Sequence, residues 1–278
     1  MASITDCVVE GLKYPFNDIK KLLGLGVLFA LISALSTFIS TQSFEVSTIT
    51  MNFVENANGT VSQMASSQLP TGNIYLIIGL SVLSFIVSLF ILGYQYDIVK
   101  FAIDKKPELP GFNDVIDLFV KGIKYFIVVV AYNVIPMIVL FAGMVFGGDV
   151  SVMMVFILIS VLLFIIAYFL LVMAINNMVA HDSIKKAFDF KEITDNIANL
   201  GWGKYIGIII FTVIVYVIIM VAVSFVLSFI TVALSIAIPN QIIAISIVVA
   251  IIEGLFIDSY ASIFFNRVCG SIYRESIK

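Results

Sequence analysis

Two acidic side chains, Glu253 and Asp258, lie in the last long apolar stretch of the chain. A carboxylate at bilayer depth costs about 2.5–3.5 kcal/mol on insertion scales, so each is a candidate functional group. No Lys or Arg lies deep in an apolar stretch to pair with them. The pair predicts either a site for a cation or proton, or neutral carboxyls that hydrogen-bond neighbouring helices together.

Further polar residues follow these acids along the same stretch. Asp258, Ser262 and Asn266 have the spacing i, i+4, i+8, which predicts a polar stripe that leads to the inner surface. Tyr260 lies seven residues after Glu253 and is expected on its face. Five residues of a straight α-helix turn through about 500°, so Glu253 and Asp258 are expected to point apart.

The composition defines the setting of these residues. The chain has 278 residues, of which 61% are hydrophobic and only 12% charged. Soluble domains are about 45–50% apolar and about 25% charged, so a soluble enzyme domain, a nucleic-acid binder and a disordered chain are all excluded. Runs of about 20 apolar residues predict membrane-spanning helices. Six such runs are present: Leu22–Thr41, Ile74–Phe101, Gly122–Phe146, Val152–Met178, Tyr205–Leu234 and Ile242–Val268.

The basic residues predict the orientation of these spans. All 15 Lys and Arg residues lie before the first span, between spans two and three, between spans four and five, after span six, or within three residues of those same span ends. Basic residues mark the cytoplasmic side, so a multi-pass cell-membrane protein with both termini in the cytoplasm is expected. Residues 42–73, with the sequon at Asn58, form the expected extracytoplasmic polar loop. Cys7 and Cys269 are then expected as free thiols.

A motif recurs before each odd-numbered span. It consists of Phe, any residue, an acid, a β-branched residue and a later Gly. Its members are Phe16, Asp18 and Gly26, then Phe112, Asp114 and Gly122, then Phe190, Glu192 and Gly201. Apolar residues at helical spacing predict three short cytoplasmic amphipathic helices lying at the headgroups, each ending where the glycine lets the chain turn into the bilayer.

The whole chain is therefore expected to be one all-α membrane domain of three helical hairpins with a threefold internal repeat. The approximate repeats are residues 15–103, 111–184 and 189–272. Pro136 lies deep in the third span, three residues after Asn133, and predicts a kink there. Asn176 and Asn177 are further polar residues, at the inner end of the fourth span.

The stretch Gly93–Lys124 resembles a signature of an uncharacterised family of polytopic membrane proteins that is common in methanogenic archaea. The matching residues are Gly93-Tyr94, Leu109-Pro110, Phe112, Asp114 and Gly122-Ile123-Lys124. The resemblance implies about six spans, a domain of unknown function and no assigned activity. It carries over no catalytic residue.

Three classes of function remain open on the sequence. The first is a small-solute or ion transporter or channel that uses Glu253 and Asp258. The second is a non-enzymatic scaffold that organises lipids or proteins through its amphipathic helices. The third is an enzyme acting on lipids, which is disfavoured because hydrolase, zinc-protease and phosphate-loop motifs are missing. No metal or cofactor and no nucleic acid is expected. The expected partners are the bilayer, further copies of the chain, or other membrane proteins.

The predicted threading is testable through the loop that contains Asn58. A cysteine introduced at Asn58 is expected to react with an impermeant maleimide in intact cells, because that loop faces outward. A cysteine at Lys105 serves as the matched control and is expected to react only after permeabilisation. Labelling of Asn58→Cys that also requires permeabilisation would contradict this orientation.

Overall fold

The computed structural model describes residues 4–51 and 71–277. It is 91% helical, and its described residues contain no strand, which confirms the predicted all-α class. Six helices are long and apolar enough to cross a membrane, as the hydropathy predicted. Asn58 lies outside the described residues.

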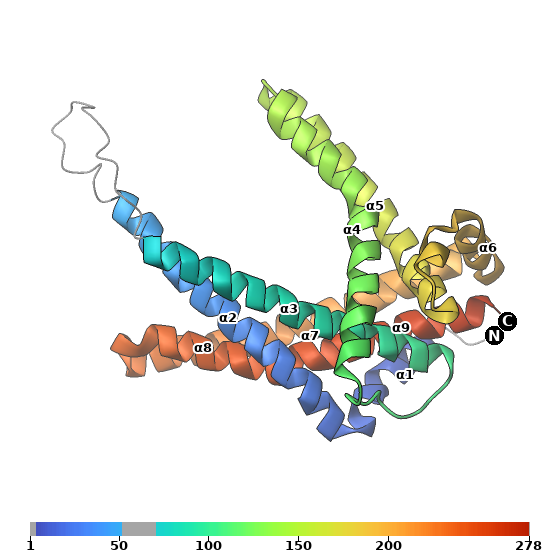
Figure 1. The fold of residues 1–278 in the computed structure, drawn as a ribbon, viewed down its shortest axis with the longest axis horizontal. Coiled ribbons are helices and arrows are strands. Elements are labelled where there is room, and N and C mark those ends of the chain that lie inside the picture. The colour runs from blue at the N-terminus through green and yellow to red at the C-terminus, as the bar shows by residue number, and fades with distance from the viewer. Residues whose placement is uncertain (1–3, 52–70, 278) are drawn as a thin grey trace. The chain divides into compact units, whose positions relative to one another are not determined.

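Figure 1 shows the described helices, which are labelled there in chain order. Their bounds are α1 Ile4–Lys13, α2 Ile19–Met51, α3 Thr71–Ile103, α4 Val115–Phe146, α5 Val150–His181, α6 Phe190–Leu200, α7 Trp202–Ala237, α8 Ile242–Ile252 and α9 Ser259–Ser276. A π-helical turn, Glu253–Asp258, joins α8 to α9, so the last span is one helix with a wider turn inside it.

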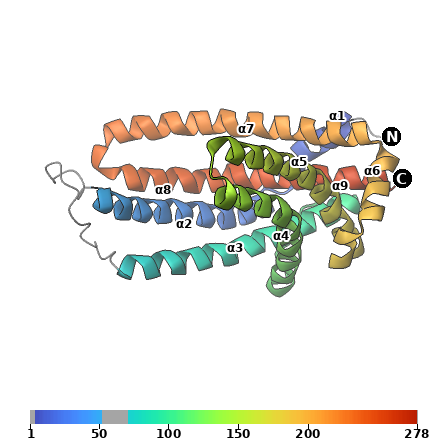
Figure 2. The same cartoon turned by 90° about the horizontal axis from the view of Figure 1, so that it is seen from above.

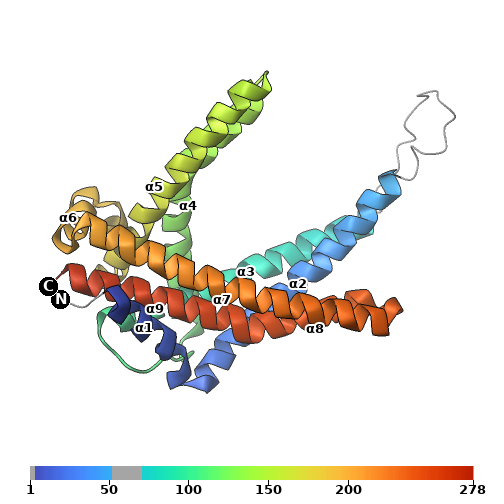
Figure 3. The same ribbon diagram turned by 180° about the vertical axis from the view of Figure 1, so that it is seen from behind.

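Two compact parts make up the chain. The first contains residues 1–22, 89–220 and 260–278, and the second contains residues 23–88 and 221–259. Along α7, Tyr216 contacts Phe265 of α9 within the first part, with ring centroids 6.3 Å apart. Figures 2 and 3 show α7 running alongside α8 and α9.

Two helices extend into the range that the sequence assigned to the polar loop. Helix α2 continues to Met51 and α3 begins at Thr71, whereas the sequence placed the whole of residues 42–73 in the loop. Ser and Thr residues were the reason for that expectation, yet within a helix their hydroxyls can bond the carbonyl four residues earlier. Thr37 and Ser40 do so, donating to the carbonyls of Ser33 and Ser36.

The expected amphipathic helices at the first two motifs are wrong in detail. Residues 15–26 comprise a 3₁₀ turn, Tyr14–Asn17, followed directly by α2. Residues 111–114 lead directly into α4. Asp114 is the N-cap of α4, where its Oδ1 accepts from the backbone N–H groups of Ile116 and Asp117, each at 3.0 Å. The shared acid of the motif therefore begins the spanning helix itself.

Asp18 has the same role at the start of α2. Its side chain accepts from the backbone N–H of Lys21 at 3.2 Å, and these contacts hold the pKa of Asp18 below its usual value. In the third motif the cap is Asp189, which accepts from the backbone N–H of Glu192. Of the three motifs, only the third lies on a separate helix, α6, ahead of its span; at the first, the separate helix α1 ends before the motif begins.

The motif glycines also differ from one another. Gly201 ends α6 with φ of +92°, a conformation that L side chains rarely adopt, so it turns the chain as predicted. Gly26 and Gly122 instead lie inside α2 and α4. The expectation that they turn the chain into the bilayer is wrong, because the helix has already begun at the Asp cap.

Gly122 instead permits a close crossing of α3 and α4 within the first part. A Cβ at Gly122 would overlap the carbonyl oxygen of Leu89, and a Cβ at Gly93 would overlap that of Leu118. The two helix backbones are therefore in direct contact, which is how small residues allow spans to associate.

A second reciprocal crossing joins α2 to the π-turn within the second part. A Cβ at Gly26 would overlap the carbonyl oxygen of Leu255. One at Gly254 would press on the backbone of Phe29 and Ala30. The glycines thus bring the backbone of α2 directly against the turn that carries both intramembrane acids.

Helices α4 and α5 pack against each other as a hairpin. A Cβ at Gly143 would meet the side chain of Phe156, so the two helices are also close near the hairpin's tip. Helix α4 continues through Pro136 and bends part-way along its length (Figures 1 and 3). Ser160 of α5 is buried and donates to the Pro136 carbonyl at 2.8 Å, which binds α5 to α4 at the proline.

The α3–α4 crossing gives a direct test of the packing. Replacing Gly122 by Ala is expected to destabilise the protein by about 1–3 kcal/mol, because the added methyl meets a backbone carbonyl that cannot move aside cheaply. This is opposite to the intrinsic preference of a helix for Ala over Gly. The measurement is thermal unfolding in detergent. Gly79→Ala in α3 is the matched control, since its Cβ has nothing within 4 Å. Equal effects of the two substitutions would contradict the crossing.

Candidate functional site

The π-helical turn changes the relation between the two intramembrane acids. Its hydrogen bonds join residues five apart rather than four. Glu253 and Asp258 are five apart, so the turn brings them towards one face. The expectation that they point apart assumed a straight α-helix and is wrong for that reason. Single π-turns inside α-helices occur frequently at functional sites.

One face of α2 supports this turn. Gly26, Ala30 and Ser33 have the spacing i, i+4, i+7, which places them on a single helix face. The first two contact the backbone of the turn, and Ser33 Oγ lies 3.5 Å from Asp258 Oδ2 as a donor. Small residues thus let the turn approach closely while a hydroxyl reaches one carboxylate.

The carboxylates remain without a cationic protein partner. Among the ion pairs of the described residues, none includes Glu253 or Asp258. Both side chains are half-buried. Two carboxylates carried by one π-turn and a hydroxyl beside one of them, all oxygen ligands, are groups of the kind that hold a hard cation or take up a proton. The described residues contain no group of three or more His, Cys, Asp or Glu placed to hold a metal ion.

The other members of the predicted stripe have partners within the first part. Ser262 Oγ accepts from Gln95 Nε2 at 2.9 Å. Asn266 donates to the Ser262 carbonyl at 2.9 Å and accepts from the Tyr125 hydroxyl at 3.5 Å. These residues connect α9 to α3 and α4, which is the role of interhelical hydrogen bonding that polar residues in spans commonly have.

Tyr260 forms a contact with the first motif. Its hydroxyl donates to the Leu12 carbonyl at 3.0 Å, and its ring lies 5.4 Å from that of Phe16. Its proposed association with Glu253 is therefore not needed to account for a tyrosine here.

The same arrangement recurs at the other two motifs, always within the first part. Tyr94 stacks on Phe112 at 4.5 Å and donates to the Pro110 carbonyl. Tyr132 contacts Phe190 at 6.0 Å and donates to the Ala187 carbonyl. Each motif Phe thus packs on a tyrosine that is hydrogen-bonded to a carbonyl two to four residues before the Phe. The sequence signal for this was the Phe alone, because the tyrosines lie on distant spans.

Buried ion pairs, which the sequence did not predict, join the first helix to the last. Glu10 of α1 pairs with Arg267 at 2.6 Å and with Arg274 at 2.9 Å, both on α9. Arg267 has a side chain only 5% exposed, and its guanidinium also lies 4.0 Å from the centre of the Tyr14 ring. Burial raises the pKa of Glu10, but the hydrogen bonds and charges of the two arginines outweigh it and hold that pKa below its usual value.

Two further ion pairs join α4 to its neighbours. Lys121 lies 2.7 Å from Asp97 of α3, and Lys124 lies 2.9 Å from Asp182, which follows α5. The Tyr96 hydroxyl also donates to Asp182, and these hydrogen bonds lower the pKa of the Asp182 carboxyl. His181, the last residue of α5, lies 3.6 Å from Glu192. All these acids lie near basic residues that the sequence had used only for orientation.

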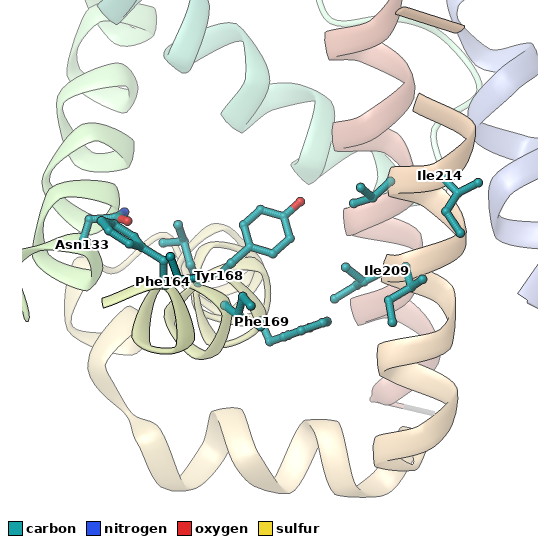
Figure 4. Close-up of a pocket in the computed structure, with 11 residues that line it drawn as sticks. Asn133, Phe164, Tyr168, Phe169, Ile209 and Ile214 are labelled. Carbon is teal, nitrogen blue, oxygen red and sulfur yellow. The ribbon is translucent and has the colours of Figure 1, made fainter. Parts of the chain in front are cut away.

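An apolar cavity of about 540 Å³ lies in the first part between α4, α5 and α7. Figure 4 shows Asn133 at one side and Tyr168 and Phe169 extending from α5. Asn133 donates to the Val129 carbonyl of its own helix at 2.7 Å. The lining otherwise consists of Val161, Phe164, Ile165, Leu171, Ile209, Ile210, Val213 and Ile214. The cavity therefore suits a hydrocarbon chain.

A smaller cavity of about 90 Å³ adjoins the first, because Tyr168 and Leu171 line both. Four side chains with hydroxyl or amide groups line it: Tyr125, Tyr168, Asn176 and Asn266. Asn176 is fully buried, and its Oδ1 has no hydrogen-bond donor among the described residues. Such an unsatisfied buried group costs about 1–3 kcal/mol, so the residue calls for an explanation.

The structure thus shows a polytopic helical membrane protein with an acidic π-turn and a two-part cavity. Comparison with known proteins identifies the family to which the chain belongs. The family described as a protein of unknown function (DUF4013) matches residues 76–228, more than half of the chain, and the chain belongs to this family. No curated protein and no solved structure matches it.

The Glu10 ion pairs give a prediction with a defined pH dependence. Glu10→Gln is expected to cost about 3 kcal/mol of stability near neutral pH, because it removes the carboxylate that pairs with the buried Arg267 and the nearer of the two that pair with Arg274. Because folding lowers the Glu10 pKa, this stabilisation is present above the unfolded-state pKa of about 4.3 and is lost as pH falls through the folded-state value.

The measurement is thermal unfolding in detergent from pH 7 to pH 3. The difference in melting temperature between the native protein and Glu10→Gln is expected to disappear towards pH 3. Asp195→Asn is the control, since Asp195 is exposed and forms none of the described ion pairs. A melting-temperature difference that does not change with pH would contradict stabilisation by the Glu10 ion pairs.

Proposed function

We propose that this protein moves a monovalent cation or a proton across the membrane, with Glu253 and Asp258 as the groups that bind it. The observation that supports the proposal is the π-turn, which brings the two carboxylates towards one face, where neither forms an ion pair among the described residues. A structural ion pair would instead show a nearby Lys or Arg, as at Glu10 and Asp97.

Ser33 and the neighbouring backbone support the same interpretation. A cation stripped of water needs several oxygen ligands, and the turn offers two carboxylates beside a hydroxyl. For a proton, two adjacent carboxyls that differ in protonation would form the relay found in proton-conducting spans. The cation site and the proton relay both need only residues of the second part.

The proposed topology places this site inside a six-span bundle with cytoplasmic termini in the cell membrane, as the distribution of Lys and Arg indicates. The repeated contact between each motif Phe and a tyrosine supports, in addition, a threefold repeat of the spans. No step of the proposal requires a cofactor or enzymatic chemistry.

A scaffold that organises lipids or proteins is the second candidate. Exposed apolar residues at the starts of α4 and α6 favour it: Val115, Ile116 and Phe190 are 61%, 78% and 54% exposed. Against it, the apolar face of α6 is partly used within the protein, since Ile193 and Ile197 are fully buried. The two candidates differ in whether the intramembrane acids matter.

Flux in proteoliposomes distinguishes them. The protein is reconstituted, and uptake of Na⁺, K⁺ or H⁺ is followed with ion-sensitive dyes under an imposed gradient. Glu253→Gln and Asp258→Asn, singly and together, are expected to lower uptake at least tenfold. Melting temperatures are expected to stay the same or to rise, because neither substitution breaks an ion pair.

Asp149→Asn is the matched control, an exposed acid whose side chain makes no capping hydrogen bond at the start of α5. It is expected to leave uptake unchanged. Flux of each ion that is equal in the native protein, the double variant and empty vesicles would overturn the transport proposal and favour the scaffold.

A further inference from the structure

The two adjoining cavities of the first part have opposite chemistry, which is the feature of a site for an amphipathic molecule. The larger one is lined by apolar side chains apart from Asn133 and Tyr168, and several of its residues are exposed at the protein's surface. On a spanning helix, that surface faces lipid. The smaller one is enclosed among α3, α4, α5 and α9 and holds the polar side chains.

Asn176 defines what the smaller cavity can bind. Its Nδ2 donates to the Val172 carbonyl at 2.7 Å, so the amide cannot be flipped and Oδ1 must be the free atom. A carbonyl oxygen accepts only, so the occupant must bring a donor. The neighbouring Asn266 is already committed to Tyr125 and the Ser262 carbonyl.

Tyr168 supplies the complementary group. It lines both cavities, and no hydrogen bond of its hydroxyl is found among the described residues. A phenol can donate, so an occupant that both donates and accepts would satisfy Asn176 and Tyr168 together. A single hydroxyl does both.

Charge excludes the other common lipid heads. No Lys, Arg, Asp, Glu or His lines either cavity. A phosphate, a carboxylate or an ammonium group would therefore be desolvated without a counter-charge, which is strongly unfavourable. The head must be neutral and small, because the cavity that receives it is about 90 Å³.

The order of the two cavities along α5 matches the polar head and apolar chain of a lipid in a bilayer. Asn176 lies five residues before the end of α5, and the apolar lining extends back along α5 to Val161. Fifteen residues of helix span about 22 Å, enough for one long chain. The polar end then lies nearer the membrane surface and the apolar end nearer its middle.

From these observations we infer that the first part binds a neutral lipid alcohol, with its hydroxyl between Asn176 and Tyr168 and its chain in the cavity between α4, α5 and α7. The inference is independent of the cation site, because it uses none of the residues around the π-turn.

The test uses the full-length protein in detergent and a photoreactive long-chain alcohol, a hexadecanol with a diazirine in its chain. Crosslinked peptides are expected from α5 and α7. Hexadecane, hexadecanoate and hexadecylamine serve as competitors. Hexadecanol is expected to compete at least tenfold better than the other three, which lack a neutral hydroxyl head.

Separate substitutions test the site for the hydroxyl group and the cavity for the hydrocarbon chain. Asn176→Leu and Tyr168→Phe are each expected to weaken alcohol binding at least fivefold while leaving weak hexadecane binding unchanged. Val213→Trp fills the apolar cavity without touching the head site, and it is expected to abolish labelling even if Asn176→Leu does not fold. Asn133→Leu is the control, because its amide is bonded to its own helix and its loss should spare the alcohol.

Several outcomes would overturn the inference. These are equal competition by hexadecanol and hexadecane, preference for a charged head, or labelling that persists in Val213→Trp. Unchanged alcohol affinity in folded Asn176→Leu would show that water alone satisfies Asn176.

Discussion

A polar side chain on a spanning helix has to find its partner inside the protein, because hydrocarbon offers none. Much of the first part can be understood from this constraint. Arg267, Lys121 and Lys124 each lie against a carboxylate, and Ser262 and Asn266 bond to residues on other helices. Exceptions are therefore informative: among the described residues, the acids of the π-turn form no ion pair, and the Oδ1 of Asn176 is one of the few buried side-chain atoms without a hydrogen-bond partner.

Close backbone contact is the second condition for these arrangements. Side-chain hydrogen bonds between spans are short-ranged, so the helices have to approach within reach. Reciprocal glycines achieve this at two places, Gly93 with Gly122 and Gly26 with Gly254. The second pair places α2 against the π-turn, and this is why a residue as short as Ser33 can reach Asp258.

Hydropathy predicted the helical class and the six spans, since each span needs only a long apolar run. It placed Asp18 and Asp114 on amphipathic helices because periodicity does not show where a helix begins; a capping Asp before a β-branched residue was the signal that was missed. The π-turn at Glu253 could not be predicted, since it depends on the contact of Gly254 with α2, which is distant in sequence. Nor does any local pattern reveal that Tyr94, Tyr132 and Tyr260 each pack on a motif Phe.

The pairing of Glu10 with Arg267 and Arg274 also has a consequence for biosynthesis. Residues 10 and 267 are 257 positions apart, so the ribosome completes α1 long before it reaches the arginines. At about 5–20 residues per second, the first helix waits roughly 10–50 s for its counter-charges. During that interval its acidic side chain is solvated or held by other molecules, and α1 can dock only once α9 has been synthesised. A nascent chain that stops before α9 would then display α1 undocked, as a mark of unfinished assembly that quality-control proteases can read.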